Sequence, residues 1–191
     1  MIEEEELRSY LASSGAFLEG HFLLSSGLHS PNYVQCALAL KATAWAGRMG
    51  SALAEGWSGP RPDLVLSPAM GGLIIGHETA RAFGVDFLFT ERENNAMALR
   101  RGFALPKGAK LIIVEDVFTT GKSTLETAAV AAAAGAVTLG AMSVINRMGE
   151  KTLPFPALSL LRLALTTYQP EKCPLCTAGV PLVKPGSRKL T

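Results

Sequence analysis

Two adjacent carboxylates, Glu115 and Asp116, mark the stretch of this sequence with the clearest chemistry. They follow the apolar run from Leu111 to Val114, which has the length and composition of a buried strand. A loop of threonine, glycine and serine comes next, and then an alanine-rich segment typical of a helix. In an open parallel sheet, ligands bind beyond the carboxyl end of a strand and beside the following helix. We therefore expect the ligand site at this turn.

The loop Thr119-Thr120-Gly121-Lys122-Ser123 offers backbone N–H groups and hydroxyls to an anion, and the helix dipole favours negative charge there. Gly121 lets the backbone approach a ligand closely. The carboxylates repel phosphate, so their natural partners are sugar hydroxyls or a hydrated Mg²⁺. A ligand with a phosphate at one end and a vicinal diol nearby, such as ribose 5-phosphate, satisfies both groups.

Two other interpretations of this turn are possible. Gly121-Lys122-Ser123 invites comparison with the P-loop of NTPases, but that motif requires a glycine where Asp116 stands. The plainest alternative is a strand-to-helix turn whose Asp and Thr side chains cap the helix. The sequence contains no G-x-S-x-G motif, so it gives no support to a serine nucleophile of that kind.

The composition of the chain limits the classes of protein to which it can belong. The 191 residues fit about one domain, and 48% hydrophobic against 18% charged residues excludes a disordered chain. A net charge of +2 is too small to indicate binding to nucleic acid or to an anionic membrane. Three cysteines cannot form a disulfide framework, and the acidic start of the chain does not resemble a signal peptide, so we expect a cytoplasmic protein.

Strand and helix patterns alternate along most of the chain, which predicts an α/β fold with a central parallel sheet covered on both faces. Residues 127–145 carry no charge, but Gly135 divides them into a helical and a β-branched half rather than a membrane span. A hairpin region is expected over 17–36 and a long loop or irregular ribbon over 91–107. Helices are expected over 3–15, 37–57, 73–83 and 123–134, and strands over 63–67, 85–89, 110–114, 137–145 and 158–165.

The stretch from Glu115 to Ser123 resembles the phosphoribosyl-diphosphate (PRPP) signature of type I phosphoribosyltransferases. Ser67-Pro68-Ala69-Met70-Gly71-Gly72 is similar to the pyrophosphate loop of the same family. The run from Gly20 to Tyr33 resembles the base-covering hood of its orotate-specific members, and Val144-Ile145-Asn146-Arg147 ends where those members carry an arginine for the base. The tail from Cys173 to Arg188 is similar to that of a thermophile-type subgroup.

This resemblance implies a type I phosphoribosyltransferase fold in a single domain over 1–191. Its core sheet would lie within 60–147, and residues 1–36 with parts of the tail would form the hood. The implied PRPP contacts are Glu115, Asp116, Val117, Phe118, Thr119, Thr120, Gly121, Lys122, Ser123, Ala69, Met70, Gly71 and Gly72. The implied orotate contacts are Thr119, Arg147, Ser26 and Tyr33. Catalytic roles fall to Asp116, Glu115, Arg92, Arg100 and Arg101, with Mg²⁺ carried by PRPP near the two acids.

The chain departs from better-known members at three places. Ser25 and Gly71 stand where those members have lysines, and the segment from Glu91 to Gly102 has arginines but no histidine. Either Arg92, Arg100 and Arg101 neutralise the pyrophosphate or the acceptor is not orotate, and a solvated basic loop is the plain reading of Arg100-Arg101.

The implied reaction joins orotate to PRPP, giving orotidine 5′-monophosphate and pyrophosphate, in a homodimer that binds neither nucleic acid nor membrane. The alternatives are a phosphoribosyltransferase for a purine or another acceptor, and a non-catalytic nucleotide-sensing regulator on the same fold.

Cys173-x-x-Cys176 has the spacing of half a zinc site, but Cys36 is the only other cysteine, so four cysteine ligands are impossible within one chain. A turn with two free thiols is the simpler interpretation, with a metal or redox role as the alternative. His21, His29 and His77 show no metal-ligand spacing. His77 reads as a packed or half-exposed side chain, and His29 is the better functional candidate because it lies in the expected hood.

Overall fold

The computed structural model describes residues 2–24 and 26–185. Ser25 of the expected hood and residues 186–188 of the tail lie outside these ranges. Within them, no helix combines the length and the apolar character that crossing a bilayer requires. The uncharged stretch 127–145 instead forms the end of a helix, a turn and a strand, as expected.

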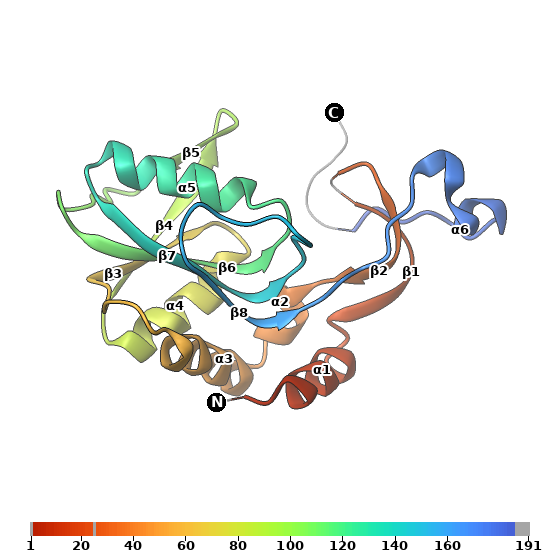
Figure 1. Ribbon diagram of the computed structural model, residues 1–191, viewed down its shortest axis with the longest axis horizontal. Coiled ribbons are helices and arrows are strands. Elements are labelled where there is room, and N and C mark those ends of the chain that lie inside the picture. Colours follow the sequence, from red (N-terminus) through yellow and green to blue (C-terminus); the bar gives the residue numbers. More distant parts are fainter. Residues whose placement is uncertain (1, 25, 186–191) are drawn as a thin grey trace.

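A six-stranded sheet in the order β5-β4-β3-β6-β7-β8 forms the centre of the molecule (Figure 1). Neighbouring strands run parallel, except that β5 is antiparallel to β4. The strands are β3 (Leu64–Pro68), β4 (Asp86–Glu93), β5 (Ala96–Leu99), β6 (Lys110–Phe118), β7 (Val137–Asn146) and β8 (Ala157–Arg162). The mostly parallel sheet expected from the alternating pattern is confirmed.

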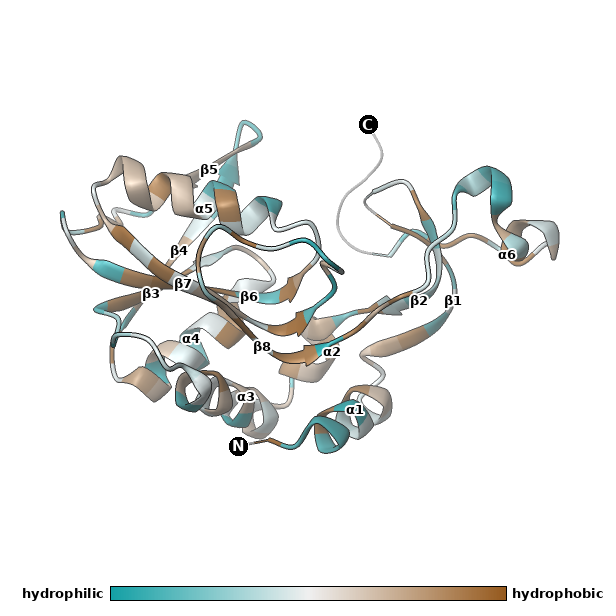
Figure 2. Ribbon diagram, in the orientation of Figure 1, coloured by the Kyte–Doolittle hydropathy of each residue, from teal (hydrophilic) through white to brown (hydrophobic). Residues whose placement is uncertain are grey.

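Helices cover both faces of this sheet (Figure 1). Helices α3 (Thr43–Gly56) and α4 (Gly72–Phe83) lie on one face, and α5 (Lys122–Ala133) lies on the other. Because successive strand residues point to opposite faces, Val65 and Ile112 join the core under α3 and α4, whereas Leu64, Leu66 and Leu111 join the core under α5. Figure 2 shows the resulting concentration of hydrophobic residues on the central strands.

The N-terminal part and the tail form a smaller assembly beside the sheet (Figure 1). It consists of α1 (Glu4–Ser13), the antiparallel strands β1 (Phe17–Leu23) and β2 (His29–Val34), and α2 (Cys36–Leu40). The tail contributes a 3₁₀ turn (Pro170–Lys172) and α6 (Pro174–Thr177). It also pairs with the hairpin at two isolated bridges, Phe22 with Val183 and His29 with Tyr168. The expected hairpin region is confirmed.

Two sequence expectations near the site are wrong in detail. The single helix expected over 37–57 is broken into α2 and α3, because Ala42 has an extended backbone (φ −83°, ψ 101°) between them. The third strand does not end at Val114: β6 continues to Phe118, because Glu115, Val117 and Phe118 pair with β7. The two acids therefore lie on a strand rather than in a turn, and the sheet ladder restricts their backbone.

The segment expected to be a loop or irregular ribbon over 91–107 begins as a regular hairpin. Strand β4 extends to Glu93 and pairs with β5 across a turn at Asn94 and Asn95. Both asparagines have positive φ (48° and 66°), which is the backbone that a tight two-residue hairpin turn needs and that Asn tolerates. The remainder of the segment, residues 100–107, has no helix or strand.

The close contact of α3 with α4 generates a prediction about Gly50. A Cβ at Gly50 would lie 2.6 Å from the carbonyl carbon of Glu78, which belongs to the backbone of α4. Gly50→Ala should therefore destabilise the protein, because overpacking costs about 1–3 kcal/mol and exceeds the helix-propensity gain of about 1 kcal/mol. Urea denaturation would measure a net loss of about 1–2 kcal/mol.

The matched control is Ser51→Ala in the same helix, which should change the free energy of unfolding by no more than about 0.5 kcal/mol. Equal or higher stability of Gly50→Ala would contradict the close approach of the two helices.

Candidate active site

The site lies where the order of the sheet reverses. Strands β3 and β6 are neighbours, but the chain continues from β3 to β4 on one side and from β6 to β7 on the other. The loops after β3 and β6 therefore leave the sheet in opposite directions at the carboxyl ends of the strands, which is where open α/β sheets bind ligands. This is the position that the sequence predicts for a ligand.

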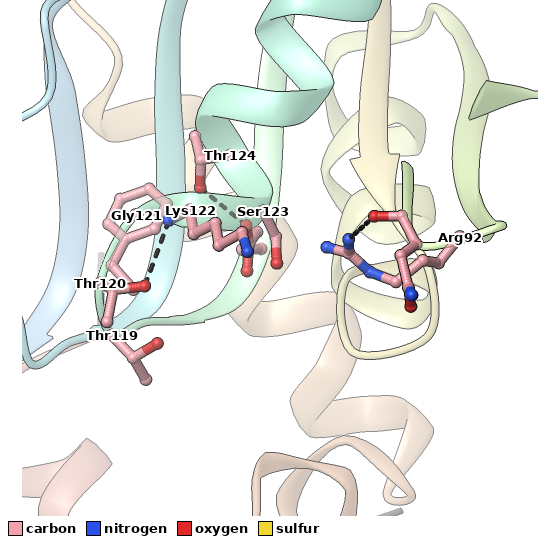
Figure 3. Close-up of a pocket in the computed structure, with 10 residues that line it drawn as sticks. Arg92, Thr119, Thr120, Gly121, Lys122, Ser123 and Thr124 are labelled. Atoms are coloured by element: carbon pink, nitrogen blue, oxygen red, sulfur yellow. Dashed lines mark hydrogen bonds between the residues drawn. The ribbon is translucent and has the colours of Figure 1, made fainter. Parts of the chain in front are cut away.

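A cavity of about 310 Å³ occupies this end of the sheet. Figure 3 shows the loop after β6 on one side of it and Arg92 of β4 on the other. The lining residues are Arg92, Asn95, Glu115, Phe118, Thr119, Thr120, Gly121, Lys122, Ser123 and Thr124. Eight of these were predicted from the sequence, and Asn95 and Thr124 were not.

The loop after β6 is shaped to present backbone to the cavity. Gly121 immediately precedes α5 with φ +75°, a left-handed conformation that glycine adopts without strain. The hydroxyl of Thr120 accepts a hydrogen bond from the Lys122 N–H at 3.3 Å (Figure 3). Twelve helical residues follow, so the positive end of the α5 dipole faces the loop. These features would suit the binding of an anion such as a phosphate.

The acidic doublet is half-buried beneath that loop. Glu115 accepts a hydrogen bond from the Thr124 hydroxyl at 2.7 Å, and Asp116 accepts one from the Val117 N–H at 2.8 Å. Burial raises the pKa of Glu115 to about 7; the Thr124 hydrogen bond opposes this rise, and the neighbouring Asp116 charge adds to it. Burial raises the pKa of Asp116 as well. A cation or a sugar diol beside the doublet would favour its ionised form.

The loop after β3 packs directly against this doublet. A Cβ at Gly71 would lie 2.5 Å from Oδ1 of Asp116, and one at Gly72 would lie 2.7 Å from the Val114 carbonyl oxygen. Only glycine fits either position while the strands keep their spacing. The peptide bond between Ala69 and Met70 is cis, and the Met70 side chain is 80% exposed. The structure thus brings the expected pyrophosphate loop and the expected ribose acids into contact.

A third group of residues lies on the hairpin side of Asp116. The Arg147 N–H donates to the Phe118 carbonyl at 2.8 Å, and the Arg147 guanidinium Nε is buried without a hydrogen-bond partner among the described residues. Burial lowers the pKa of Arg147, and the nearby Tyr33 and Cys36 act in the opposite direction. Burial also raises the pKa of Tyr33, with a further rise from Asp116. Cys36, which sequence reasoning missed, places its thiol 3.9 Å from the Asp116 carbonyl.

The three predicted arginines differ in position. Arg92 lines the cavity, forms an ion pair with Glu126 of α5 and donates to the Asn95 carbonyl at 2.7 Å. Arg100 and Arg101 do not line it: they pair with Glu93 at 3.4 Å and with Glu91 at 2.8 Å. Ser26 is exposed at the tip of the hairpin. No local signal could have singled out Asn95, whereas Thr124 lies one position beyond the predicted loop.

Comparison with known proteins agrees with this arrangement. No family model matches the chain. The orotate phosphoribosyltransferase of Chlorobium phaeobacteroides is 47% identical over 180 residues, which cover 94% of this chain and 93% of the relative. That of Caldanaerobacter subterraneus is 43% identical, covering 99% of this chain and all of the relative. The chain belongs to the orotate phosphoribosyltransferase family.

The expected family and its fold are thereby confirmed. The crystal structure of orotate phosphoribosyltransferase from Aeropyrum pernix superposes with a TM-score of 0.71 at 25% identity, covering 82% of this chain and 93% of that chain. An adenine phosphoribosyltransferase from Thermoanaerobacter pseudethanolicus shares the fold, with a TM-score of 0.61 at 18% identity, covering 69% of this chain and 88% of that chain.

The raised pKa of Glu115 generates a prediction about stability. An acid whose pKa rises from 4.5 to about 7 on folding binds its proton more tightly in the folded state, so the stability of the unliganded protein falls as pH rises through this window. Glu115→Gln removes that cost. Relative to wild type, the variant should gain up to about 3 kcal/mol at pH 8 and little at pH 5.

Urea unfolding of both proteins at pH 5 and pH 8 measures this difference. Glu5→Gln, at an exposed glutamate in α1, is the control and should give the same small change at both pH values. A Glu115→Gln gain that does not depend on pH would contradict the buried, proton-binding environment.

Proposed function

We propose that this chain transfers the phosphoribosyl group of PRPP to orotate, giving orotidine 5′-monophosphate and pyrophosphate. The observation that carries the proposal is the acidic doublet between a phosphate-binding turn and a buried arginine, in a chain of the orotate phosphoribosyltransferase family. The three parts lie in the order in which the product joins a phosphate, a ribose and an anionic base.

The 5-phosphate of the ribose would bind in the loop Thr119–Ser123. Backbone N–H groups at the start of α5 and the Thr and Ser hydroxyls are its donors, and Gly121 leaves the approach free of a side chain. Lys122 lines the cavity and adds a positive charge, although its ammonium also lies 3.8 Å from Glu126. Backbone donors of this kind hold a phosphate without needing an arginine clamp.

Glu115 and Asp116 would hold the 2- and 3-hydroxyls of the ribose, directly or through Mg²⁺. The donor set fits this ion, since Mg²⁺ is bound through carboxylate oxygens together with water and substrate oxygens. When bound with PRPP, Mg²⁺ would neutralise charge on the diphosphate that leaves. Thr124 and the Val117 N–H fix the orientation of the two carboxylates before substrate arrives.

The pyrophosphate would lie against the turn Ala69–Gly72. Glycines at 71 and 72 bring the backbone of this turn against the strand end, so the leaving group can approach backbone N–H groups rather than side chains. No lysine stands in this turn, so the arginines of the β4–β5 region are the available positive charges. Arg92 is placed to act from within the same chain, and Arg100 and Arg101 would act across the interface of a homodimer.

Arg147 would bind the anionic edge of orotate. Its guanidinium is half-buried and its Nε has no partner among the residues that the structure describes, so a ligand carboxylate or carbonyl would satisfy it. Tyr33 and Ser26 of the hairpin would cover the base, and Thr119 would lie at its junction with the ribose. An anionic acceptor suits this end better than a neutral purine, because a buried cation without a counter-charge is costly.

The chemistry would proceed by substitution at the anomeric carbon. A ring nitrogen of orotate forms the new C–N bond while the bond from the anomeric carbon to the diphosphate oxygen breaks, and the electron pair leaves with pyrophosphate. The sugar passes through a transition state with oxocarbenium character, so no covalent nucleophile on the protein is needed. The residues of this chain align the two reactants, neutralise the leaving group and exclude water.

The three free cysteines fit a reducing compartment such as the cytoplasm.

A panel of acceptors tests the proposal. Purified protein is supplied with PRPP, Mg²⁺ and one of orotate, uracil, adenine or hypoxanthine, and pyrophosphate release is followed. Orotate alone should support turnover at a rate typical of enzymes, on the order of 1–100 per second. Turnover with a purine but not with orotate would reject orotate as the acceptor. No pyrophosphate release with any of the bases would reject the proposed activity.

Arg147 carries a second prediction. Arg147→Ala should lower kcat/KM for orotate by about 30-fold or more, because truncating one partner of a buried charge pair costs about 2–5 kcal/mol. The KM for PRPP should change by less than about threefold, because the phosphate loop and the acids are untouched. Steady-state kinetics with each substrate varied in turn separates the two effects.

The control is Arg162→Ala on the neighbouring strand β8, where the arginine is exposed. This variant should keep both kinetic parameters. Comparable losses for orotate and PRPP in Arg147→Ala would overturn the assignment of Arg147 to the base.

A further inference from the structure

Four potential metal ligands converge where the tail meets the hairpin, outside the cavity described above. They are His21 of β1, His29 at the start of β2, Cys173 just before α6, and Cys176 within α6. Their ligand atoms all lie within 4.8 Å of one another, and His21, His29 and Cys173 are buried. Figure 1 shows α6 beside the hairpin, away from α5 and its phosphate loop.

Four of the six distances between ligand atoms in this cluster are close to those around one tetrahedral ion, and the other two are no longer than 4.8 Å. Nε2 of His21 lies 2.9 Å from Nδ1 of His29, 3.4 Å from Sγ of Cys173 and 3.7 Å from Sγ of Cys176. Sγ of Cys176 lies 3.3 Å from Nδ1 of His29. Bonds of about 2.0 Å to nitrogen and about 2.3 Å to sulfur in a tetrahedron place two nitrogens about 3.3 Å apart and a nitrogen and a sulfur about 3.6 Å apart.

The hydrogen bonding of His21 aims a lone pair at the centre of the cluster. Nδ1 of His21 lies 2.8 Å from the Val180 carbonyl oxygen, which can only accept, so Nδ1 carries the proton. In the neutral imidazole Nε2 is then the nitrogen with the free lone pair, and it lies within 3.7 Å of Nδ1 of His29 and of both cysteine sulfurs. A backbone carbonyl that fixes the tautomer in this way is the usual outer partner of a metal-binding histidine.

We propose that His21, His29, Cys173 and Cys176 bind one Zn²⁺ in a closed tetrahedral site that fastens the C-terminal tail to the hairpin. Two thiolates and two imidazoles are a ligand set that zinc favours, and four protein ligands leave no position for a reacting water. Both thiols lose their protons on binding, so the two thiolates balance the charge of the ion. The role is therefore structural rather than catalytic.

The segment that zinc would hold has little else to order it. Among residues 166–185, all of which the structure describes, Cys173 alone is buried. Four backbone hydrogen bonds connect this segment to the hairpin: two between Tyr168 and His29, and two that join Val183 to His21 and Leu23. Ordering a residue costs about 1–2 kcal/mol of backbone entropy, and a two-stranded hairpin is itself marginal in water. Because this segment buries little apolar surface, metal binding would supply the free energy that orders it.

The structure shows a grouping that spacing along the sequence does not reveal. Cys173 and Cys176 are free thiols, as the simpler interpretation predicts, but they lie beside two histidines and so favour the alternative of a metal role. His21 and His29 are eight positions apart, but the antiparallel pairing of β1 with β2 brings them together. The tail then adds the cysteines from about 145 residues further along the chain.

Elemental analysis of the full-length protein tests the proposal. The protein is isolated without a polyhistidine tag, under reducing conditions, from cells grown with added zinc, and is passed over a chelating resin. About one zinc per chain should remain. Replacement by Co²⁺ should give the visible absorption of a tetrahedral site together with thiolate-to-cobalt charge transfer. Neither signal depends on enzymatic activity.

The double variant Cys173→Ser, Cys176→Ser should contain less than about a tenth of a zinc per chain, because the two hard hydroxyls replace the thiolates that favour the ion. Cys36→Ala removes the thiol outside the cluster, and His77→Asn removes the exposed imidazole; both should keep a full zinc content. Removing zinc from the folded wild type with a strong chelator should lower its Tm by roughly 5–10 °C and expose residues 166–185 to proteolysis. Adding zinc back should reverse both changes.

Three results would overturn the proposal. The first is wild-type protein that holds no zinc and gives no tetrahedral cobalt spectrum. The second is zinc that persists in the double variant, which would place the ion elsewhere. The third is a Cys173–Cys176 disulfide in freshly isolated protein, detected by mass spectrometry after alkylation. The chelator experiment keeps the test decisive if the double variant does not fold.

Discussion

Two neighbouring carboxylates held half-buried at the end of a strand are the constraint around which this molecule is arranged. Burial raises the pKa of both Glu115 and Asp116, so the unliganded site is electrostatically unfavourable near neutral pH. The fold maintains it by giving each carboxylate one hydrogen bond and by placing glycine at 71, where any side chain would collide with Asp116. A ligand that brings a cation or hydroxyl donors to the two carboxylates would stabilise their ionised form.

Two positive groups accompany the acidic doublet. The positive end of α5 faces the loop that follows the doublet, and Tyr33 lies near both Asp116 and the half-buried guanidinium of Arg147. A phosphate, a diol and an anionic base would suit the helix end, the acids and the guanidinium respectively. Because such a ligand is anionic at both ends and the site has a positive group for each end, charge alone does not choose between the two orientations. The backbone N–H groups at the start of α5, which suit a phosphate, would make that choice.

The sequence predicted those parts of the site that are encoded locally. A buried strand, two acids, a Thr/Gly loop and a helix start are contiguous, so their pattern alone placed Glu115 through Ser123 at the carboxyl edge of a sheet. The features that it missed depend on pairing between distant segments. The ladder with β7 carries β6 on to Phe118, and the tail brings Cys173 and Cys176 to the hairpin. Periodicity within a segment carries no information about such partners, and the broken helix at Ala42 likewise reflects packing rather than composition.

The sheet and the tail are therefore ordered by different forces, and this difference bears on catalysis. The sheet buries two apolar layers, one of which the hairpin joins through Phe17 and Val34, whereas the tail relies on a few hydrogen bonds to the hairpin and on the proposed zinc. Strand β2 begins at a proposed zinc ligand, His29, and reaches Tyr33 about 13 Å along the strand, at about 3.3 Å per residue. Because Tyr33 lies near both Asp116 and Arg147, an ion bound at one end of this strand would restrict the position of the side chain proposed to cover the base. A closed metal site far from the reacting atoms can in this way set the geometry of the acceptor pocket while the loops around the phosphate remain free to move.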